Sequence, residues 1–244
     1  MIIVTGGTHG IGRACVEYLA SDRTPVMFTG RDREAGAEVE RLVSGATYVA
    51  CDVAIETDCR RAVDTALSLG RGRIDGLVNN AGMSSRVSFA QSTAGDWDRI
   101  MAVNARSAFL FTRFAINGLI AARGAVVNVS SIAGKGGEEG LAIYCASKAA
   151  LIGFTQALAL EFGEDVRFNA VCPGQINTRM MSGINADSEA RRRLELRIPA
   201  RRFGAPAEVA KVVGWLLSSD ASYVNGTVVT VDGGETAGLR TPRG

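Results

Sequence analysis

Short apolar runs alternate along the chain with longer stretches whose apolar positions recur at helical spacing. The short runs are rich in Val and Ile or apolar nearly throughout, which predicts strands covered on both faces, as in a parallel sheet. The expected strands are Ile2–Thr5, Pro25–Thr29, Thr47–Cys51, Gly76–Asn79, Ala125–Ser130, Val166–Val171 and Thr227–Val231. The expected helices are Ile11–Ala20, Arg33–Leu42, Cys59–Leu69, Asp96–Ala121, Tyr144–Phe162 and Ala207–Ser218. This alternation predicts an α/β fold with a Rossmann-type, doubly wound sheet of about seven parallel strands flanked by helices.

One segment, residues 175–202, departs from the alternation because it is long, polar and helix-prone and follows a strand end. Ligands of open parallel sheets bind beyond the carboxyl ends of the strands, so we expect a substrate lid here, with a mobile surface excursion as the alternative. No Pro/Ser-rich linker or internal repeat divides the chain. We therefore expect a single domain over residues 1–244, ending in a C-terminal tail at 235–244.

Composition narrows the classes of partner. The 27 basic and 25 acidic side chains nearly balance, which argues against nucleic-acid binding. No uncharged apolar run approaches the ~20 residues of a membrane span. The five cysteines are scattered, without a Cys-x-x-Cys pair, which argues against a disulfide framework and against a zinc site. No signal peptide precedes the first strand, and a cytoplasmic protein without a metal is expected.

The turn between the first strand and the first helix is rich in glycine: Thr5-Gly6-Gly7-Thr8-His9-Gly10-Ile11-Gly12. Glycine lets the backbone approach a pyrophosphate closely, and a helix N-terminus offers free N–H groups to the anion. The spacing differs from the common dinucleotide fingerprint, and an ordinary glycine-rich turn is the alternative. Because the turn opens a strand–helix–strand unit, it favours a phosphate site formed by Gly6, Thr8, His9, Gly10, Ile11 and Gly12.

The end of the second strand predicts the choice of cofactor. An acidic residue there would bind the ribose hydroxyls of NAD, but the chain has Gly30 followed by Arg31. A guanidinium pairs with a 2′-phosphate, so NADP(H) is expected over NAD(H). His9 either assists with this phosphate or has no ligand role, and the charge of Asp32 opposes the preference. After the third strand, Asp52-Val53 is expected to contact the adenine, or Asp52 only caps a helix.

A second group of residues suits proton transfer to a carbonyl oxygen. Tyr144 and Lys148 are four residues apart on an expected helix and therefore share one face. A nearby ammonium favours the phenolate and lowers the phenol pKa from its usual ~10. Ser131 follows the fifth strand, where its hydroxyl would point into the ligand crevice as a second donor or cap the strand end. Taken alone, such a Tyr/Lys pair is usually only a surface contact.

In this order, the motifs resemble those of the short-chain dehydrogenase/reductase family over about residues 1–234. The matching elements are Thr5-Gly6-x-x-x-Gly10-Ile11-Gly12, Asn79-Asn80-Ala81-Gly82, Ser131, Tyr144-x-x-x-Lys148, Pro173-Gly174 and Val231-Asp232-Gly233-Gly234. The resemblance implies that Tyr144 is the general acid/base and that Ser131 donates to the substrate oxygen. It implies that Lys148 lowers the tyrosine pKa and binds the nicotinamide ribose.

The resemblance also assigns further positions. Asn104 matches the asparagine that holds an ordered water in a proton relay to the lysine. Asn80, Ala81 and Gly82 would line the adenosine and ribose. Pro173, Gly174, Ile176 and Thr178 would flank the nicotinamide, with the Ile176 backbone holding its carboxamide. Family members are commonly tetramers or dimers, so a homo-oligomer is expected.

The expected activity is hydride transfer between a nicotinamide and a carbonyl or secondary alcohol of a small molecule. The substrate is left open between a 3-oxoacyl thioester and a sugar, polyol or secondary metabolite. The loops 84–88, 135–143 and 175–202 should shape the pocket, and Arg86, Glu138 and Glu139 make a polar substrate conceivable. A non-catalytic NADP(H)-binding sensor or scaffold is the alternative from another class.

Overall fold

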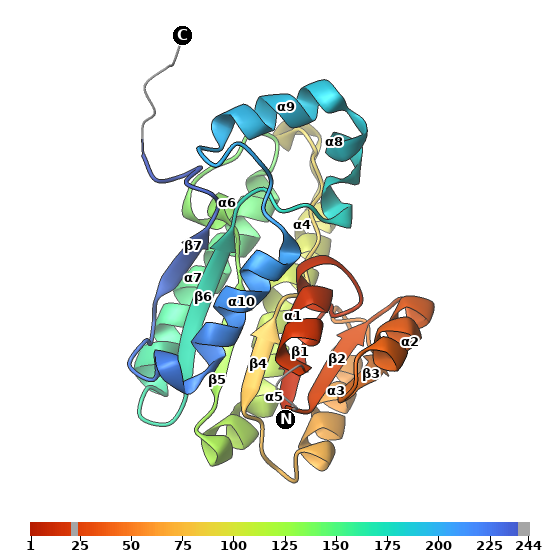
Figure 1. The fold of residues 1–244 in the computed structure, drawn as a ribbon, viewed down its shortest axis with the longest axis vertical. Helices are drawn as coiled ribbons and strands as arrows, with labels where there is room; N and C mark the ends of the chain where they lie inside the picture. The colour runs from red at the N-terminus through yellow and green to blue at the C-terminus, as the bar shows by residue number, and fades with distance from the viewer. Residues whose placement is uncertain (21–23, 239–244) are drawn as a thin grey trace.

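The strand order of the sheet sets where a ligand can bind. The computed structural model describes residues 1–20 and 24–238. Its seven strands form one wholly parallel sheet in the order β3-β2-β1-β4-β5-β6-β7 (Figure 1). They are β1 (Ile2–Val4), β2 (Val26–Gly30), β3 (Ala46–Ala50), β4 (Gly76–Asn79), β5 (Ala125–Val129), β6 (Arg167–Pro173) and β7 (Val228–Val231). The expected doubly wound sheet is confirmed, and its topological switch point lies between β1 and β4.

Helices cover both faces of this sheet. They are α1 (Gly10–Ala20), α2 (Arg33–Leu42), α3 (Glu56–Leu69), α5 (Ser107–Ala122), α7 (Ala142–Glu161) and α10 (Pro206–Leu217). A further helix, α4 (Ala94–Met101), packs against α7. Successive side chains of β1 enter opposite cores, because side chains alternate across a strand. Val4 packs with Val16 of α1 and Val213 of α10. Ile3 packs in the other core with Phe111 of α5.

The long helix expected over Asp96–Ala121 is interrupted in the structure. A π-helical turn, η2 (Ala102–Arg106), separates α4 from α5. Asn104 lies inside this turn, and its buried side chain is held by hydrogen bonds to Met83 and Ser147. These contacts join segments far apart in the sequence, which helical periodicity does not report. Such π-turns occur frequently at functional sites.

The segment 175–202 is largely helical. It forms η3 (Arg179–Met181), α8 (Ser182–Ala186) and α9 (Ser188–Arg197), and Figure 1 shows α8 and α9 beyond the carboxyl ends of the strands. A parallel bridge between Ile176 and Gly204 closes the base of the segment. The remaining short elements are η1 (Phe89–Gln91), α6 (Ile132–Lys135) and η4 (Ser219–Ala221). The segment is therefore placed where a lid over the sheet edge is expected.

Among the described residues, α7 is the one helix long and apolar enough, by length and composition, to cross a membrane. This is weak evidence, because core helices of soluble proteins pass the same test. In the fold, α7 lies against β5 and β6 and carries the buried Lys148. Its apolar character is therefore accounted for in part by packing on the sheet.

Candidate active site

A cleft of about 620 Å³ is lined by residues at the carboxyl ends of the strands and by residues of the segment 175–202. Most of the residues singled out in the sequence line it. They are Gly6, Thr8, His9, Gly10, Ile11, Arg31, Asp52, Val53, Asn80, Ala81, Gly82, Ser131, Tyr144, Lys148, Pro173, Gly174, Ile176 and Thr178. Gly12 and Asn104 are not part of the cleft wall. The structure thus brings together motifs spread over more than half of the chain.

The glycine-rich turn has a backbone conformation that glycine, which has no Cβ, adopts more readily than other residues. Gly6 and Gly10 adopt positive φ angles of 66° and 55°. A Cβ on Gly12 would lie 2.2 Å from the carbonyl oxygen of Gly6 and 2.4 Å from Nδ2 of Asn80. Gly12 therefore lets α1 pack against the turn and shapes the cleft without lining it.

Asn80 and Thr5 tie the turn to the end of β4. The Asn80 side chain donates to the carbonyl oxygens of Thr5 and Gly6, at 2.9 and 3.2 Å. The Thr5 hydroxyl accepts from the backbone N–H groups of Asn80 and Ala81, at 2.9 and 3.0 Å. These hydrogen bonds fix the glycine-rich turn next to the end of β4, at the switch point of the sheet. A fixed, glycine-lined turn at a helix N-terminus fits the pyrophosphate of a dinucleotide.

Ser131 and Tyr144 meet at the other end of the cleft. Ser131 is the N-cap of α6, and its Oγ accepts from the backbone N–H of Ala133 at 3.1 Å. A hydrogen bond from Ser131 lowers the pKa of Tyr144, but burial raises it more, so the net shift is upward. The sequence led us to expect a lowered value. The difference arises because desolvation of the phenol outweighs the hydrogen bond from Ser131, and the nearby charge of Glu138 raises the pKa of Tyr144 further, which favours the protonated phenol.

Lys148 lies behind the tyrosine. Its Nζ is 5.9 Å from the centroid of the Tyr144 ring and donates to the carbonyl oxygen of Val129 at 2.8 Å. The side chain is almost fully buried, and this burial lowers the pKa of Lys148 to about 8. A Cβ on Gly82 would lie 3.3 Å from Lys148 Nζ, so the glycine leaves room beside the amine. Lys148 can therefore exchange a proton near neutral pH.

The lowered lysine pKa predicts a pH-dependent stability difference. Below about pH 8 the folded protein holds a buried ammonium, which opposes folding. Between about pH 8 and the unfolded value of ~10.4, only the unfolded chain keeps the proton, so stability rises with pH. We expect Lys148→Met to raise the Tm at pH 7, and this gain to shrink as pH rises through that window. The exposed Lys211→Met is the control, and a gain that stays constant with pH would contradict the buried charge.

Asn104 connects the segment after β4, at Met83, to α7, at Ser147. Its Oδ1 accepts from the backbone N–H of Met83 at 2.8 Å. Its Nδ2 donates to the carbonyl oxygen of Met83 and to Oγ of Ser147, both at 2.9 Å. Ser147 in turn donates to the carbonyl oxygen of Tyr144 at 2.7 Å. Both amide hydrogens are thus engaged, and the side chain positions the first turn of α7. The expected relay through water stays a prediction.

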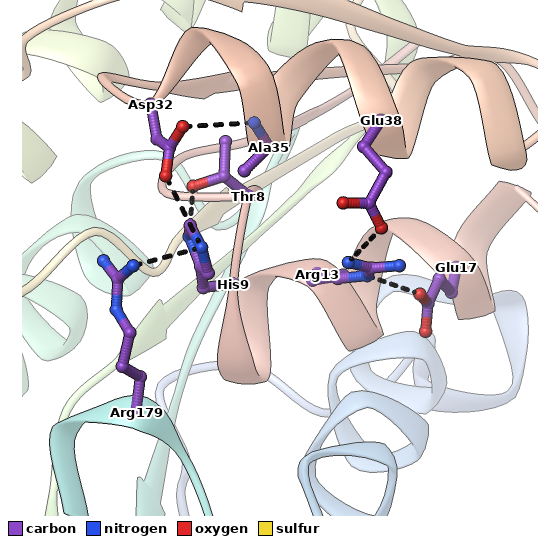
Figure 2. Close-up of polar contacts among 8 residues, drawn as sticks. All are labelled: Thr8, His9, Arg13, Glu17, Asp32, Ala35, Glu38 and Arg179. Atoms are coloured by element: carbon purple, nitrogen blue, oxygen red, sulfur yellow. Dashed lines mark hydrogen bonds and ion pairs between the residues drawn. The ribbon is translucent and has the colours of Figure 1, made fainter. Parts of the chain in front are cut away.

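Charged groups gather at the far end of the cleft, beyond β2 and β3. Arg31 is 77% exposed, and its Nη1 lies 4.0 Å from Oδ2 of Asp52, so it is loosely held. Asp52 Oδ1 accepts from the backbone N–H of Ala54 at 3.0 Å in the turn before α3. The N-cap of α3 is Ile55, so the alternative that Asp52 caps this helix is wrong. Asp32 Oδ1 caps α2 by accepting from the backbone N–H of Ala35 at 3.1 Å (Figure 2).

The structure adds cleft residues that the motifs did not reveal. Met180, Met181 and Ile184 line the cleft from the segment 175–202, in elements whose pattern was too irregular to interpret from sequence. Arg86 and Glu138, expected to favour a polar substrate, pair with each other at 2.7 Å. These loops therefore offer a substrate more apolar surface and less free charge than the sequence indicated.

Arg179 also lines the cleft. Its position directly after Thr178 was the available signal in the sequence. The residue's contact with His9 joins segments 170 residues apart, which local patterns do not show.

Comparisons with known proteins agree with this geometry. A family model described as enoyl-(acyl carrier protein) reductase matches residues 6–236. The chain is 34% identical over 250 residues to meso-2,3-butanediol dehydrogenase of Serratia marcescens, covering 100% of this chain and 97% of that protein. It is 38% identical over 239 residues to a 3-oxoacyl-[acyl-carrier-protein] reductase of Aquifex aeolicus, covering 95% of each.

A solved structure gives the same result. The crystal structure of a protein assigned as a gluconate dehydrogenase from Agrobacterium tumefaciens superposes with a TM-score of 0.91 at 31% identity, covering 98% of this chain and 96% of that chain. The sequence motifs, the strand order of the sheet and the relatives all indicate the same family, over nearly the whole chain. The chain therefore belongs to the short-chain dehydrogenase/reductase family, whose enzymes interconvert CH–OH and C=O groups with a nicotinamide cofactor.

Proposed function

We propose that this protein is an NADP(H)-dependent oxidoreductase that acts on the carbonyl or secondary alcohol of a small molecule, with Tyr144 as general acid/base. The observation that carries the proposal is one cleft with two chemically different ends. Ser131, Tyr144 and Lys148 lie at one end, and the glycine-rich turn and Arg31 lie at the other. A dinucleotide laid between these ends brings its nicotinamide to the tyrosine.

The side chains divide the proton chemistry among them. When bound, the cofactor supplies the hydride for reduction of a carbonyl carbon, or accepts it in the reverse reaction. Tyr144 gives its phenolic proton to the carbonyl oxygen, and the Ser131 hydroxyl donates a hydrogen bond to the same atom. The Lys148 ammonium stabilises the phenolate and returns a proton to it, with Asn104 and water completing the relay. In oxidation, the same groups carry the proton away from the alcohol.

The remaining cleft residues hold the cofactor. Asp52 and Val53 would contact the adenine, while Asn80, Ala81 and Gly82 would line the adenosine and ribose. Lys148 would also bind the nicotinamide ribose. The residues that would flank the nicotinamide and its carboxamide are Pro173, Gly174, Ile176 and Thr178.

The NADP(H) preference is tested at Arg31. A guanidinium pairs with a 2′-phosphate in bidentate fashion. Neither the last residue of β2, Gly30, nor the next residue is acidic, and Asp32 Oδ1 is used to cap α2. We expect Arg31→Gln to weaken NADPH binding by about 10-fold or more, with NADH binding changed less than about 3-fold. Arg33→Gln, on an exposed neighbour outside the cleft, is the matched control in a calorimetric titration. Equal weakening of both cofactors by Arg31→Gln would contradict the assignment.

Two substrate classes remain in view, 3-oxoacyl thioesters and sugars, polyols or secondary metabolites. The apolar lining from Met180, Met181 and Ile184 suits an acyl chain, and the relatives include both a 3-oxoacyl-carrier reductase and a diol dehydrogenase. An acyl carrier protein is acidic and would be steered by charge. Its rate would fall as added salt screens that attraction, whereas the rate with a neutral sugar or polyol would not.

The proposal also covers assembly and setting. A single domain over residues 1–244 with segment 175–202 as substrate lid, working in the cytoplasm as a homotetramer or homodimer, suits the family resemblance. Leu160 on α7 and Phe109 on α5 are exposed apolar side chains that a partner subunit would cover. The convergence of Ser131, Tyr144 and Lys148 in one cleft favours catalysis over a sensor or scaffold role, because cofactor binding alone does not need a proton donor.

A further inference from the structure

The segment 175–202 reaches the glycine-rich turn through one side chain, Arg179. Nη1 of Arg179 lies 3.2 Å from Nε2 of His9, and both residues line the cleft. Figure 2 shows the guanidinium extending from η3 toward the imidazole ring, with the Asp32 carboxylate near the same ring nitrogen, Nε2. The contact joins a lid residue to the part of the cleft where the cofactor's phosphates are expected.

The donors and acceptors in this contact fix the state of the histidine. A guanidinium can only donate, so Nε2 of His9 accepts and the ring proton resides on Nδ1. That proton is directed at Oγ1 of Thr8, 2.9 Å away. Burial and the charge of Arg179 both lower the pKa of His9, in keeping with a neutral ring. His9 therefore supports Arg179 as an acceptor and brings no positive charge of its own.

The other charges around this corner are already engaged. Arg13 is bound by Glu17 and Glu38, at 2.9 and 3.1 Å, and Figure 2 shows it turned toward these carboxylates. Asp32 Oδ1 caps α2 by accepting from the backbone N–H of Ala35, and Asp32 Oδ2 lies 3.6 Å from Nε2 of His9. Within residues 1–20 and 24–238, no ion pair to a carboxylate is formed by Arg179. Its charge is therefore free to meet an anion.

The same corner also holds Arg31. Thr8 packs against the end of β2, where a Cβ on Gly30 would lie 2.5 Å from Thr8 Cγ2. This close approach brings His9, the residue after Thr8, beside the Arg31–Asp32 turn. Arg31, at the end of β2, and Arg179, from the segment 175–202, thus both line the cleft, and the neutral imidazole of His9 lies near Arg179 and near Asp32, the residue after Arg31.

We propose that Arg179 is a second ligand of the cofactor's 2′-phosphate, acting with Arg31 and positioned by His9, an inference that rests on the proposed NADP(H) preference. A phosphate accepts charge-assisted, bidentate hydrogen bonds from a guanidinium, which a neutral imidazole cannot replace. The segment 175–202 would then contribute to the discrimination between NADP(H) and NAD(H). Binding of the 2′-phosphate would be coupled to the position of this segment.

The test measures binding without turnover. NADPH, NADH, adenosine 2′,5′-bisphosphate and ADP are titrated into the wild type, Arg179→Gln and Arg179→Lys. We expect Arg179→Gln to weaken NADPH and the 2′,5′-bisphosphate by about 10- to 100-fold, with NADH and ADP changed less than about 3-fold. Arg179→Lys should fall between, because it keeps the charge and loses the planar fork. Arg192→Gln, an exposed lid arginine outside the cleft, is the matched control.

The outcomes separate this inference from the proposed cofactor preference. The wild-type ratio of NADPH to NADH affinity reports on the preference alone, and a preference for NADH would remove both. If the wild type prefers NADPH, equal weakening of NADPH and NADH by Arg179→Gln would overturn the inference, because Arg179 would then act only on lid packing. Unchanged NADPH binding would overturn it as well.

A double-mutant cycle tests the positioning role of His9. His9→Leu removes the acceptor of the Arg179 bond, so we expect weaker NADPH binding in the wild-type background. In the Arg179→Gln background the same change should have much less effect, because the group that His9 positions is already gone. An equal loss in both backgrounds would show that His9 acts independently of Arg179.

Discussion

Replacing Tyr144 with Phe is expected to lower kcat by roughly 10²- to 10⁴-fold while leaving NADPH binding within about 3-fold of the wild type. The change removes one oxygen and keeps the ring that packs beside Lys148. Without the phenol, the carbonyl oxygen gains negative charge during hydride transfer with no side chain to protonate it. Steady-state rates at saturating cofactor, together with a calorimetric titration of NADPH, measure the two quantities separately.

The control for this variant is Tyr223→Phe, which makes the same change at a fully exposed side chain. It should leave both kcat and NADPH binding unchanged. Turnover of Tyr144→Phe at the wild-type rate would remove Tyr144 from the mechanism. A loss of NADPH binding equal to the loss of rate would show that Tyr144 holds the cofactor and is not needed for proton transfer.

Gly12→Ala should be the most damaging small substitution in the cofactor site. Its new Cβ would lie 2.2 Å from the Gly6 carbonyl oxygen and 2.4 Å from Asn80 Nδ2, contacts that require movement of α1 or of the phosphate turn. We expect both cofactors to bind about 10-fold more weakly or worse, and the free energy of unfolding to fall by about 1–3 kcal/mol. Both NADPH and NADH should be affected, since the turn serves the pyrophosphate that they share.

Gly95→Ala is the matched control for this prediction. Gly95 lies in the first turn of α4, and the nearest atom to an added Cβ would be 3.6 Å away, an ordinary contact. This variant should be neutral or slightly more stable, because alanine favours a helix over glycine. Chemical denaturation of both variants gives the comparison. Normal cofactor binding by Gly12→Ala would show that the turn tolerates displacement and that Gly12 does not shape it.

The sequence was sufficient to predict the fold and the main residues of the cleft. Apolar runs mark strands covered on both faces, and the ordered motifs from Thr5 to Asp232 define the family. The expected Ser131, Tyr144 and Lys148 do line one cleft. The apolar runs are local, and the motifs are defined by their order along the chain. A single sequence contains both kinds of information.

Other features depend on contacts between distant segments, and the sequence did not reveal them. The π-turn at Asn104 is coupled to hydrogen bonds with Met83 and Ser147. The upward shift of the Tyr144 pKa arises from desolvation, which only the folded cleft imposes. The contact of Arg179 with His9 needs both the segment 175–202 and the glycine-rich turn in place.

The most direct test of the proposed function follows the absorbance of NADPH while the purified wild-type protein is offered ketones, 3-oxoacyl thioesters and keto-sugars. We expect NADPH to be consumed with at least one of these classes, faster than NADH, and the consumption to be lost in Tyr144→Phe. Tight binding of NADPH without consumption by any carbonyl would contradict the account and favour a sensor or scaffold. Faster consumption of NADH would contradict the assignment of Arg31 and Arg179 to a 2′-phosphate.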